Sequence, residues 1–278
     1  MRAWTSQEIL RLTPQNDKDM IISVIGHGYV GLVTAAVLAD LGNTVWCVGR
    51  TKEKIEKLKK GWVPFFEPGL EEVLKKNVAA KRLNFTLSYK EAVVPAKVVF
   101  ICVGTPSLEN GDADLSAVFS AAKSIRENLA GEEKVVVVKS TVPVGTTKKV
   151  EEIVNQPVAF VPEFLREGTA LTDTMHPDRI VIGTELEKAQ KILMELHQPI
   201  KGEFVLTNIP SAEMIKYASN SLLATKISFA NAIAFLCEKV GADVVKVLDG
   251  VGLDKRLGRN FLFPGVGYGG SCFPKDVK

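Results

Sequence analysis

The chain has 278 residues, of which 46% are hydrophobic and 24% are charged, and its formal net charge is +3. This is the composition of an ordinary globular protein, long enough for one large domain or two smaller ones. The small net charge excludes the strongly basic character of a nucleic-acid-binding protein, and no stretch has the apolar length needed to span a membrane.

The sequence opens with a charged segment and continues as alternating strands and helices. Residues 1–19 contain no apolar segment, which predicts an N-terminal extension with one short helix at 6–12 rather than a secretory signal. The elements predicted next, in chain order, are a strand at 20–25, a helix at 30–41, a strand at 44–48, helices at 52–60 and 67–76 (with Pro68 in the first turn), a strand at 97–103, a helix at 114–129, a strand at 134–139, a helix at 146–154, strands at 157–161 and 179–182, and a helix at 185–196. This alternation predicts an α/β fold with a Rossmann-like, doubly wound parallel sheet that helices cover on both faces.

The pattern changes at about residue 209. Residues 211–240 contain neither Pro nor Gly and carry apolar residues at helical spacing, which predicts one helix of about 45 Å. Gly241 ends this helix, and a short helix follows at 243–248. The predicted domains are therefore a dinucleotide-binding domain at 20–208 and a central helical region at 209–278. Since apolar residues lie on more than one face of the long helix, we expect a homodimer through it, or further chain that covers it.

The four cysteines fall into two kinds of sequence. Cys47, Cys102 and Cys237 lie in apolar strand or helix patterns without Cys-x-x-Cys spacing, which favours reduced thiols in a cytoplasmic protein over disulfides or a metal site. Cys272 instead follows three glycines in a run without hydrophobic periodicity, close to Lys275. A thiol on such a turn beside a cation has the setting of a nucleophile, although a loop thiol without a role is the alternative.

A glycine pattern predicts a dinucleotide site near the start of the sheet. Gly26, Gly28 and Gly31 follow a predicted strand and open a predicted helix. One glycine makes the turn, one lets the backbone approach a pyrophosphate, and one allows close packing of helix and strand. The helix N-terminus then binds the anion. The alternative is a tight turn that binds no nucleotide.

The second strand ends without the acidic residue that binds ribose hydroxyls in NAD-specific sites. Arg50 stands there instead, followed by Thr51 and Lys52. A cation at this position accepts a 2′-phosphate, so the sequence predicts that NADP is accepted as well as NAD. Alternatively, Arg50 is exposed to solvent or stacks on the adenine.

Polar residues follow three of the strands, at the edge where ligands bind in such folds. Thr105 and Thr141 offer hydroxyls to a ligand, or act as turn stabilisers. Glu163 and Glu167 are four residues apart, so on a helical turn they would share one face. Their repulsion would then raise one pKa and create a general base. The alternative is a solvated pair with Arg166 as counter-charge.

Two polar residues interrupt the apolar pattern of the long helix. Lys216 and Asn220 are four residues apart and therefore lie on the same face. They predict either a polar site in a cleft or a solvent-facing stripe.

Six motifs occur in one order between residues 20 and 278. They lie at 26–31, 104–106, 140–145, 162–168, 176–183 and 267–276. In this order they resemble the nucleotide-sugar 6-dehydrogenases of the UDP-glucose/GDP-mannose dehydrogenase family. The forms Phe-Leu-Arg-Glu-Gly at 164–168 and His-Pro-Asp-Arg-Ile-Val-Ile-Gly at 176–183 favour UDP-glucose over GDP-mannose and UDP-N-acetylmannosamine as the substrate.

The resemblance implies a mechanism with two hydride transfers that turn the C6 alcohol of the sugar into a carboxylate. By this resemblance Cys272 attacks the aldehyde to give a thiohemiacetal, which the second transfer converts into a thioester that water hydrolyses. The resemblance also assigns the remaining catalytic roles: oxyanion stabilisation to Lys216 and Asn220, proton handling to Asp276 with Thr141 and a water, and thioester hydrolysis to Glu163 or Glu167.

The resemblance further implies which residues bind the two ligands. The dinucleotide, NAD by family default, is bound by Gly26, Gly28, Tyr29, Val30, Gly31, Arg50, Lys52, Gly104, Thr105, Pro106 and Thr141. The sugar nucleotide is bound by Phe164, Leu165, Arg166, Glu167, Lys216, Asn220, Arg256, Tyr268 and Gly269, with Arg256 reaching a neighbouring subunit. Phe263 stands where some members carry Lys or Asn, so one substrate contact differs here.

Family members continue beyond the cysteine motif with a second α/β domain that binds the uridine end. We therefore expect this chain to be the cofactor half, with its catalytic loop, of a longer enzyme. The alternatives are a dinucleotide-binding fragment that is inactive without the other half, and a GDP-mannose or UDP-N-acetylmannosamine dehydrogenase.

Overall fold

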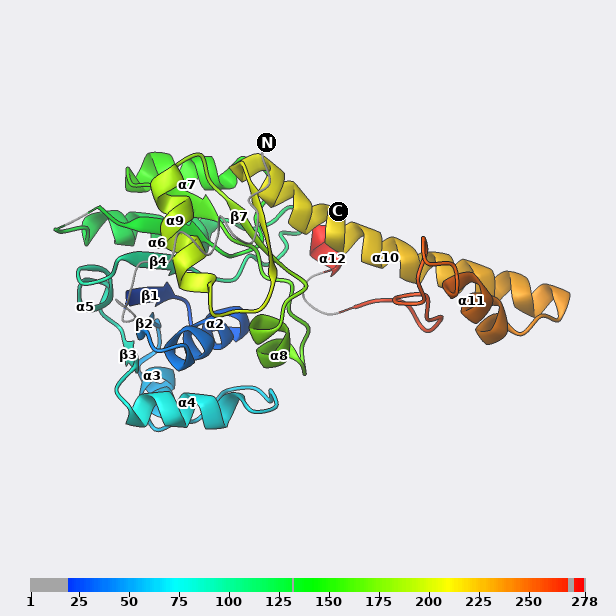
Figure 1. The fold of residues 1–278 in the computed structure, drawn as a ribbon, viewed down its shortest axis with the longest axis horizontal. Coiled ribbons are helices and arrows are strands. Elements are labelled where there is room, and N and C mark those ends of the chain that lie inside the picture. Colours follow the sequence, from blue (N-terminus) through cyan, green and yellow to red (C-terminus); the bar gives the residue numbers. More distant parts are fainter. Residues whose placement is uncertain (1–19, 132, 270–272, 278) are drawn as a thin grey trace. The chain divides into compact units, whose positions relative to one another are not determined.

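The computed structural model describes residues 20–131, 133–269 and 273–277 (Figure 1). The predicted extension at 1–19, its helix at 6–12 and Cys272 lie outside these ranges. The described chain forms two compact units. The first comprises residues 20–105 and Asp114–Met214, and the second comprises Pro106–Ala113 and the residues from Ile215 onward.

An eight-stranded sheet organises the first unit, in the order β3-β2-β1-β4-β5-β6-β7-β8. Figure 1 labels β1 to β4 and β7 of this sheet. The strands are β1 (Ile21–Ile25), β2 (Thr44–Val48), β3 (Leu83–Thr86), β4 (Val98–Ile101), β5 (Val135–Val138), β6 (Val158–Phe160), β7 (Arg179–Gly183) and β8 (Glu203–Thr207). Neighbours from β3 to β6 are parallel, and the order reverses at β1, as in a doubly wound fold. The predicted Rossmann-like α/β fold is confirmed.

One pairing departs from the predicted all-parallel sheet. β7 runs antiparallel to β6 and parallel to β8. The connection between β6 and β7 contains only the six-residue helix α8 (Ala170–Met175), so the chain re-enters the sheet at the edge where β6 ends. A parallel connection would need a longer crossover back to the start of β6.

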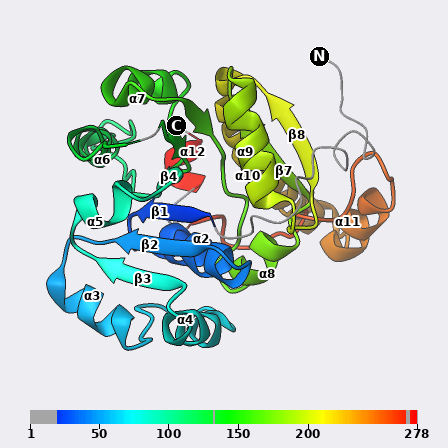
Figure 2. The same cartoon turned by 60° about the vertical axis from the view of Figure 1, so that its left-hand side comes forward.

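Helices cover both faces of the sheet. Helix α2 (Tyr29–Asp40) packs with α4 and α8 on one face, whereas α5, α6 and α7 pack together on the other (Figure 2). The remaining bounds in this unit are α3 (Lys52–Lys59), α4 (Leu70–Ala79), α5 (Tyr89–Val93), α6 (Ser116–Glu127), α7 (Thr146–Val154) and α9 (Glu187–His197). Because both faces are covered, the central strands β4 and β5 are buried throughout, as their continuous apolar sequences predict.

Helix α4 begins later than predicted. The prediction placed Pro68 in its first turn, but the helix starts at Leu70. Gly69 has a φ of 78°, in the left-handed region, so the chain turns there before the helix can form.

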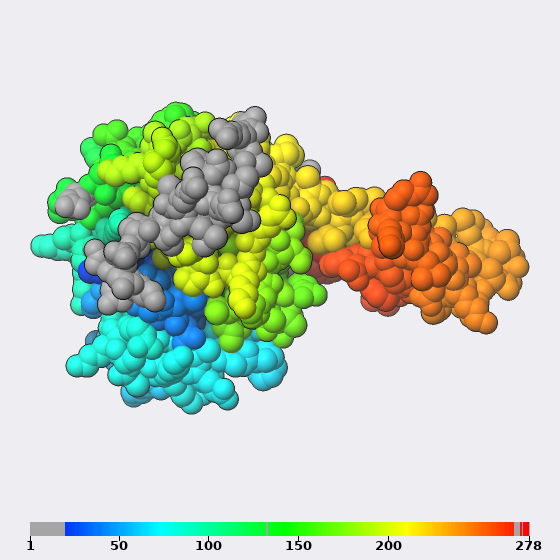
Figure 3. Space-filling view, in the orientation of Figure 1, coloured from blue at the N-terminus to red at the C-terminus, as the bar shows by residue number. Residues whose placement is uncertain are grey.

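The second unit is helical. It contains most of α10 (Ile209–Val240), together with α11 (Val244–Gly252) and α12 (Phe273–Asp276). Asp243 caps α11 by accepting from the amides of Val245 and Lys246, at 2.9 and 3.3 Å. Helix α10 lies in the region coloured yellow to orange in Figure 3. Its exposed apolar residues include Leu222, Phe229, Phe235, Leu236 and Val240.

By length and composition alone, α10 is long and apolar enough to cross a membrane, although the sequence pattern did not predict a membrane span. A single such helix is weak evidence for a membrane protein, because long helices of globular proteins can be equally apolar.

His197, at the end of α9, is a pH-sensitive residue in the core of the first unit. Burial lowers its pKa to about 4, and the charge of Lys139 acts in the same direction, against the hydrogen bond to the Leu193 carbonyl. An unfolded histidine titrates near 6.5, so between these values only the unfolded chain gains the proton. The stability that depends on a neutral His197 should therefore be fully present above pH 6.5. The free energy of unfolding should fall by about 2–3 kcal/mol when the pH is lowered to about 4.5.

Urea denaturation of wild type, His197→Phe and the exposed control His176→Gln, at both pH values, tests this pH dependence. The His197 variant should lose less stability than wild type on acidification, and the control should match wild type. Equal losses in all three proteins would contradict the assignment.

Candidate dinucleotide-binding and catalytic site

The turn after β1 has the geometry of a dinucleotide-binding turn. A Cβ on Gly26 would lie 2.6 Å from the carbonyl oxygen of Cys102, and one on Gly31 would overlap the carbonyl oxygen of Gly26. A Cβ on Gly28 would meet nothing within 4 Å in the described part of the chain. Two glycines are thus required by packing, while the third borders open space at the N-terminus of α2.

That N-terminus suits an anion. Gly28 is the N-cap of α2, and among the described residues no side chain caps it, while the first turn contains no acidic residue. The amides of the first turn therefore point away from the helix without an internal partner. Such amides, together with the helix dipole, favour a phosphate group, so this turn fits the pyrophosphate of a dinucleotide.

The end of β2 lies beside this turn and is positively charged. Arg50 is exposed, and a Cβ on Gly49 would lie 3.3 Å from Nδ1 of His27. Burial lowers the pKa of His27, and the charges of Lys54 and Arg50 lower it further. The exposure of Arg50 agrees with either of its predicted positions, in solvent or beside a ligand. Lys52 begins α3 and is exposed as well.

The loops after β4 and β5 are joined by side-chain hydrogen bonds. The Thr105 hydroxyl donates to the Thr141 carbonyl at 2.9 Å, and the Ser140 hydroxyl donates to the Val103 carbonyl at 2.7 Å. Thr105 therefore stabilises the two loops, as its alternative prediction stated. Gly104 and Pro106 are exposed beside it.

Glu213 was not predicted, yet it fixes the loop after β5. Its carboxylate is buried and accepts from the amides of Gly145 and Thr147, at 2.7 and 2.9 Å. These amides belong to the first turn of α7, which has no other cap among the described residues. No local pattern predicts this contact, because Glu213 lies 66 residues beyond Thr147.

The prediction for Glu163 and Glu167 rested on a helical turn that does not form. Residues 161–166 after β6 are irregular, and α8 starts only at Ala170, so the two carboxylates do not share a helix face. Arg166, the expected counter-charge of these two carboxylates, forms its ion pair with another residue. Arg166 binds Asp173, with its NH2 group 2.7 Å from Oδ1 and its Nε 3.0 Å from Oδ2.

Other predicted sugar-nucleotide residues of this loop pack against the first unit. The Phe164 ring lies 3.9 Å from the guanidinium carbon of Arg179, a cation–π contact. Leu165 packs against the hydrophobic core.

Lys216, Asn220 and Asp276 are buried, with exposed fractions of 4%, 7% and 5%. The solvent-facing alternative for Lys216 and Asn220 is therefore wrong. The Asn220 amide donates to Oδ2 of Asp276 at 2.6 Å, and Lys275 forms an ion pair with the other carboxylate oxygen. Within the second unit, the structure thus joins two of the predicted catalytic residues. Cys272, four residues before Asp276, lies outside the described residues.

The remaining predicted residues of the second unit are exposed or stacked. Arg256 forms an ion pair with Asp254, at 2.6 Å. The Tyr268 ring lies edge-on to Phe273, with centroids 5.7 Å apart, and Gly269 is exposed.

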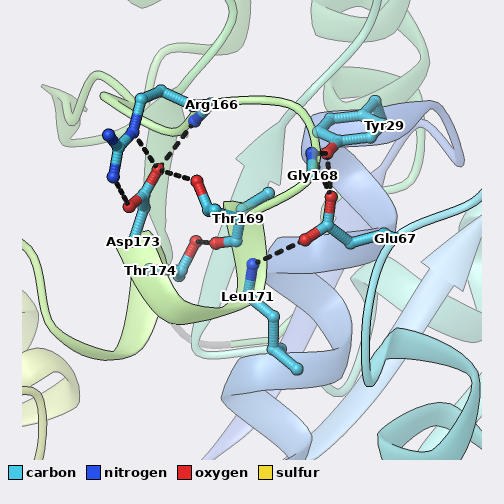
Figure 4. Close-up of polar contacts among 9 residues, drawn as sticks. Tyr29, Glu67, Arg166, Gly168, Thr169, Leu171, Asp173 and Thr174 are labelled. Carbon is cyan, nitrogen blue, oxygen red and sulfur yellow. Dashed lines mark hydrogen bonds and ion pairs between the residues drawn. The ribbon is translucent and has the colours of Figure 1, made fainter.

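A second unpredicted carboxylate, Glu67, connects three segments of the first unit (Figure 4). It is 5% exposed, and it accepts from the Tyr29 hydroxyl, from the Gly168 amide at 2.8 Å and, weakly, from the Leu171 amide at 3.4 Å. Burial raises the pKa of Tyr29, and the bond to Glu67 raises it further, so Tyr29 stays a donor at neutral pH. The sequence offered only a Glu-Pro-Gly turn as a signal for this residue.

Comparison with known proteins adds to this geometry. The sequence profile of the UDP-glucose/GDP-mannose dehydrogenase family, NAD binding domain, matches residues 20–201, and that of the central domain of the same family matches residues 210–278. The UDP-glucose 6-dehydrogenase TuaD of Bacillus subtilis is 53% identical over 264 residues, which cover 92% of this chain and 57% of the relative. A UDP-glucose 6-dehydrogenase of Rhizobium meliloti is 52% identical, with coverages of 93% and 62%.

Solved structures agree with these relatives. A UDP-glucose dehydrogenase from Pyrobaculum islandicum superposes with a TM-score of 0.90 at 43% identity, over 95% of this chain and 63% of that one. A GDP-mannose dehydrogenase from Pseudomonas aeruginosa gives 0.81 at 38% identity, over 92% and 62%. The chain spans about three fifths of the length of the relatives and structures it matches.

Proposed function

Because the chain belongs to the UDP-glucose/GDP-mannose dehydrogenase family, we propose that it oxidises the C6 alcohol of UDP-glucose to the carboxylate of UDP-glucuronate. A comparison of sequence identities supports UDP-glucose as the substrate. The relatives named UDP-glucose 6-dehydrogenase reach 52–53% identity, whereas the matched GDP-mannose dehydrogenase structure reaches 38%. The geometry that carries the proposed chemistry is the buried Asn220–Asp276 pair, 2.6 Å apart.

Each step of the proposed reaction is assigned to particular residues of the chain. Bound NAD supplies the hydride acceptor for both oxidations, and the amides at the N-terminus of α2 bind its pyrophosphate. Asp276 takes the proton of the C6 hydroxyl, in the role the family also gives Thr141, while Lys216 and Asn220 stabilise negative charge on the C6 oxygen. The Cys272 thiolate attacks the aldehyde carbon, and Glu163 or Glu167 activates the water that cleaves the thioester.

The burial of the polar face of α10 supports these roles. A lysine and an asparagine at 4% and 7% exposure stand in a low-dielectric environment, where their attraction for a developing oxyanion is stronger than in water. Hydrogen bonding to Asn220 fixes the Asp276 carboxylate in one orientation.

We also propose that NADP is accepted, through Arg50 at the end of β2. Arg50 and Lys54 place positive charge beside the dinucleotide turn, close enough to lower the pKa of His27, and this charge favours the extra phosphate of NADP. Arg50→Asp should lower kcat/KM with NADP by about 10–100-fold, because one charge-assisted contact contributes about 1.5–3 kcal/mol, and it should leave NAD turnover close to wild type.

Steady-state kinetics with both dinucleotides tests this specificity, with the exposed Lys60→Asp on the same charged segment as control. The control should change neither preference. A wild-type protein that strongly prefers NAD, or an Arg50 variant that keeps its NADP turnover, would refute the idea.

We also propose that the protein is a homodimer and is cytoplasmic. Exposed apolar residues along α10 support a homodimer through this helix, which light scattering would detect as twice the chain mass. Cys47, Cys102 and Cys237 are buried free thiols among the described residues, which supports a reducing cytoplasm.

A second candidate function is a dinucleotide-binding fragment that needs further chain for turnover. The observation in its favour is that the chain spans 57–62% of its curated relatives. Formation of NADH with UDP-glucose should be measured for the chain alone and for the chain mixed with the part of a relative that it does not match. Activity only in the mixture favours this second candidate.

A further inference from the structure

We propose that Glu67 is a positioning residue that ties the dinucleotide-binding turn to the loop carrying Glu163 and Glu167. The inference rests on the proposed function, because it assigns to that loop and turn the two ligands of one reaction. Glu67 itself lies on neither segment. It belongs to the loop before α4, and it is 38 residues from Tyr29 and 101 residues from Gly168 in sequence.

The first end of the tie is the dinucleotide turn. Tyr29 is the first residue of α2 and directly follows Gly28, so its side chain moves with the turn that faces the pyrophosphate. Its ring packs against Phe65, with centroids 4.6 Å apart, and its hydroxyl donates to the Glu67 carboxylate. The ring and the hydroxyl are thus both held by the loop before α4.

The second end is the close of the 162–168 loop. Gly168 has a φ of 89°, which favours glycine, and its amide points at both Glu67 (2.8 Å) and the Tyr29 hydroxyl (3.2 Å). The same loop is fixed a second time by Arg166, whose amide and guanidinium both bind Asp173 of α8 (Figure 4). The loop therefore has two anchors, and Glu67 connects it to the dinucleotide turn beside the longer contact of the Gly168 amide with the Tyr29 hydroxyl.

The energetics favour Glu67 over Tyr29 as the centre of the tie. A buried carboxylate needs several donors, and Glu67 accepts from the Tyr29 hydroxyl and from two amides of the chain at 168–171. Apart from Glu67, these segments share only the 3.2 Å contact between the Gly168 amide and the Tyr29 hydroxyl in this network. Removing Glu67 leaves the Gly168 amide with only the weaker Tyr29 contact, and leaves Tyr29 without an acceptor there. Both segments should then loosen together.

The consequence is coupling between the two ligands. A dinucleotide that orders the turn also orders the 162–168 loop through Glu67, and the sugar nucleotide acts in the reverse direction by the same free energy. The residue would not touch either reacting group. Its effect would be on the position of residues that do.

The test compares Glu67→Ala, Glu67→Gln and Tyr29→Phe with the control Glu72→Ala, an exposed carboxylate on α4. Equilibrium binding of NADH is followed by its fluorescence, without sugar and without turnover. We expect about tenfold weaker binding for Glu67→Ala, a smaller loss for Glu67→Gln, which keeps an acceptor oxygen, and none for the control. The double variant Tyr29→Phe/Glu67→Ala should lose less NADH affinity than the product of the two single losses, because both substitutions remove the same contact between Tyr29 and Glu67.

Hydrogen exchange distinguishes the proposed positioning role of Glu67 from a role in stability alone. In wild type, NADH should slow the exchange of amides at 163–171, and in Glu67→Ala this slowing should disappear although the protein remains folded. Slowing that persists in Glu67→Ala, or unchanged NADH affinity in that variant, overturns the inference. The shape-preserving Glu67→Gln gives the same decision if Glu67→Ala fails to fold.

The outcome is separable from that of the proposed function. A wild-type protein that binds NADH but oxidises no sugar nucleotide fails the proposed function, while the binding and exchange comparison still decides on Glu67. Normal UDP-glucuronate formation with equal NADH affinity in all variants fails the inference alone. A wild-type protein that binds no dinucleotide overturns both.

Discussion

Cys272→Ser is expected to lower the rate of UDP-glucuronate formation by roughly a thousandfold or more, the scale seen when an enzyme loses its nucleophile. A serine hydroxyl is a far weaker nucleophile than a thiolate at neutral pH, and its ester is less activated toward water. Dinucleotide binding should be unchanged, because the first unit does not contain this residue. The variant should stall after the first oxidation, with aldehyde as its product.

The measurement is a quantification of UDP-glucuronate and of aldehyde by mass spectrometry. Cys237→Ser is the matched control, since it replaces a buried thiol on α10 that has no part in the proposed chemistry. It should form the acid at close to the wild-type rate. Undiminished conversion to the acid by Cys272→Ser would exclude the thioester route.

Gly28→Ala is expected to weaken dinucleotide binding by about a hundredfold while the melting temperature stays at the wild-type value. The added methyl group would meet nothing within 4 Å in the described chain, so folding should not suffer. It would instead occupy the space through which the backbone approaches the pyrophosphate. Gly28→Ala should therefore weaken dinucleotide binding without lowering the stability of the fold.

Gly31→Ala is the contrasting variant. Its Cβ would overlap the carbonyl oxygen of Gly26, which belongs to the same turn, so it should lower the free energy of unfolding by about 3 kcal/mol or more. Titration of NADH fluorescence and thermal unfolding, on both variants, check the pair. If Gly28→Ala bound NADH with wild-type affinity, the dinucleotide could not bind at this turn as proposed.

The parts of the fold that were predictable from the sequence have strong local patterns. Strands β4 and β5 are continuous apolar runs buried on both faces, and α10 is a long helical pattern that glycine ends. Strands β3 and β8 were missed because their apolar runs are short: Asn84 interrupts β3, and β8 has only three consecutive apolar residues, at 204–206. The antiparallel pairing of β6 with β7 could not be predicted, since it depends on how far the connecting chain travels.

The site divides in the same way. The glycine turn has its own local sequence signature, so its geometry could be expected. The partners of Asn220 and Glu67 lie 56 and 101 residues away, and no local pattern encodes such contacts. The proposed pairing of Glu163 with Glu167 failed because spacing of four implies a shared face only where the backbone is helical.

The most direct test of the account is the number of dinucleotides reduced for each UDP-glucuronate formed. Each oxidation moves two electrons as one hydride, and one water enters at the thioester, so the account predicts a ratio of two. The ratio should be measured from NADH absorbance and acid yield, for the chain alone and with the unmatched part of a relative. A ratio of one with aldehyde as the end product, or no UDP-glucose-dependent reduction in either preparation, would contradict it.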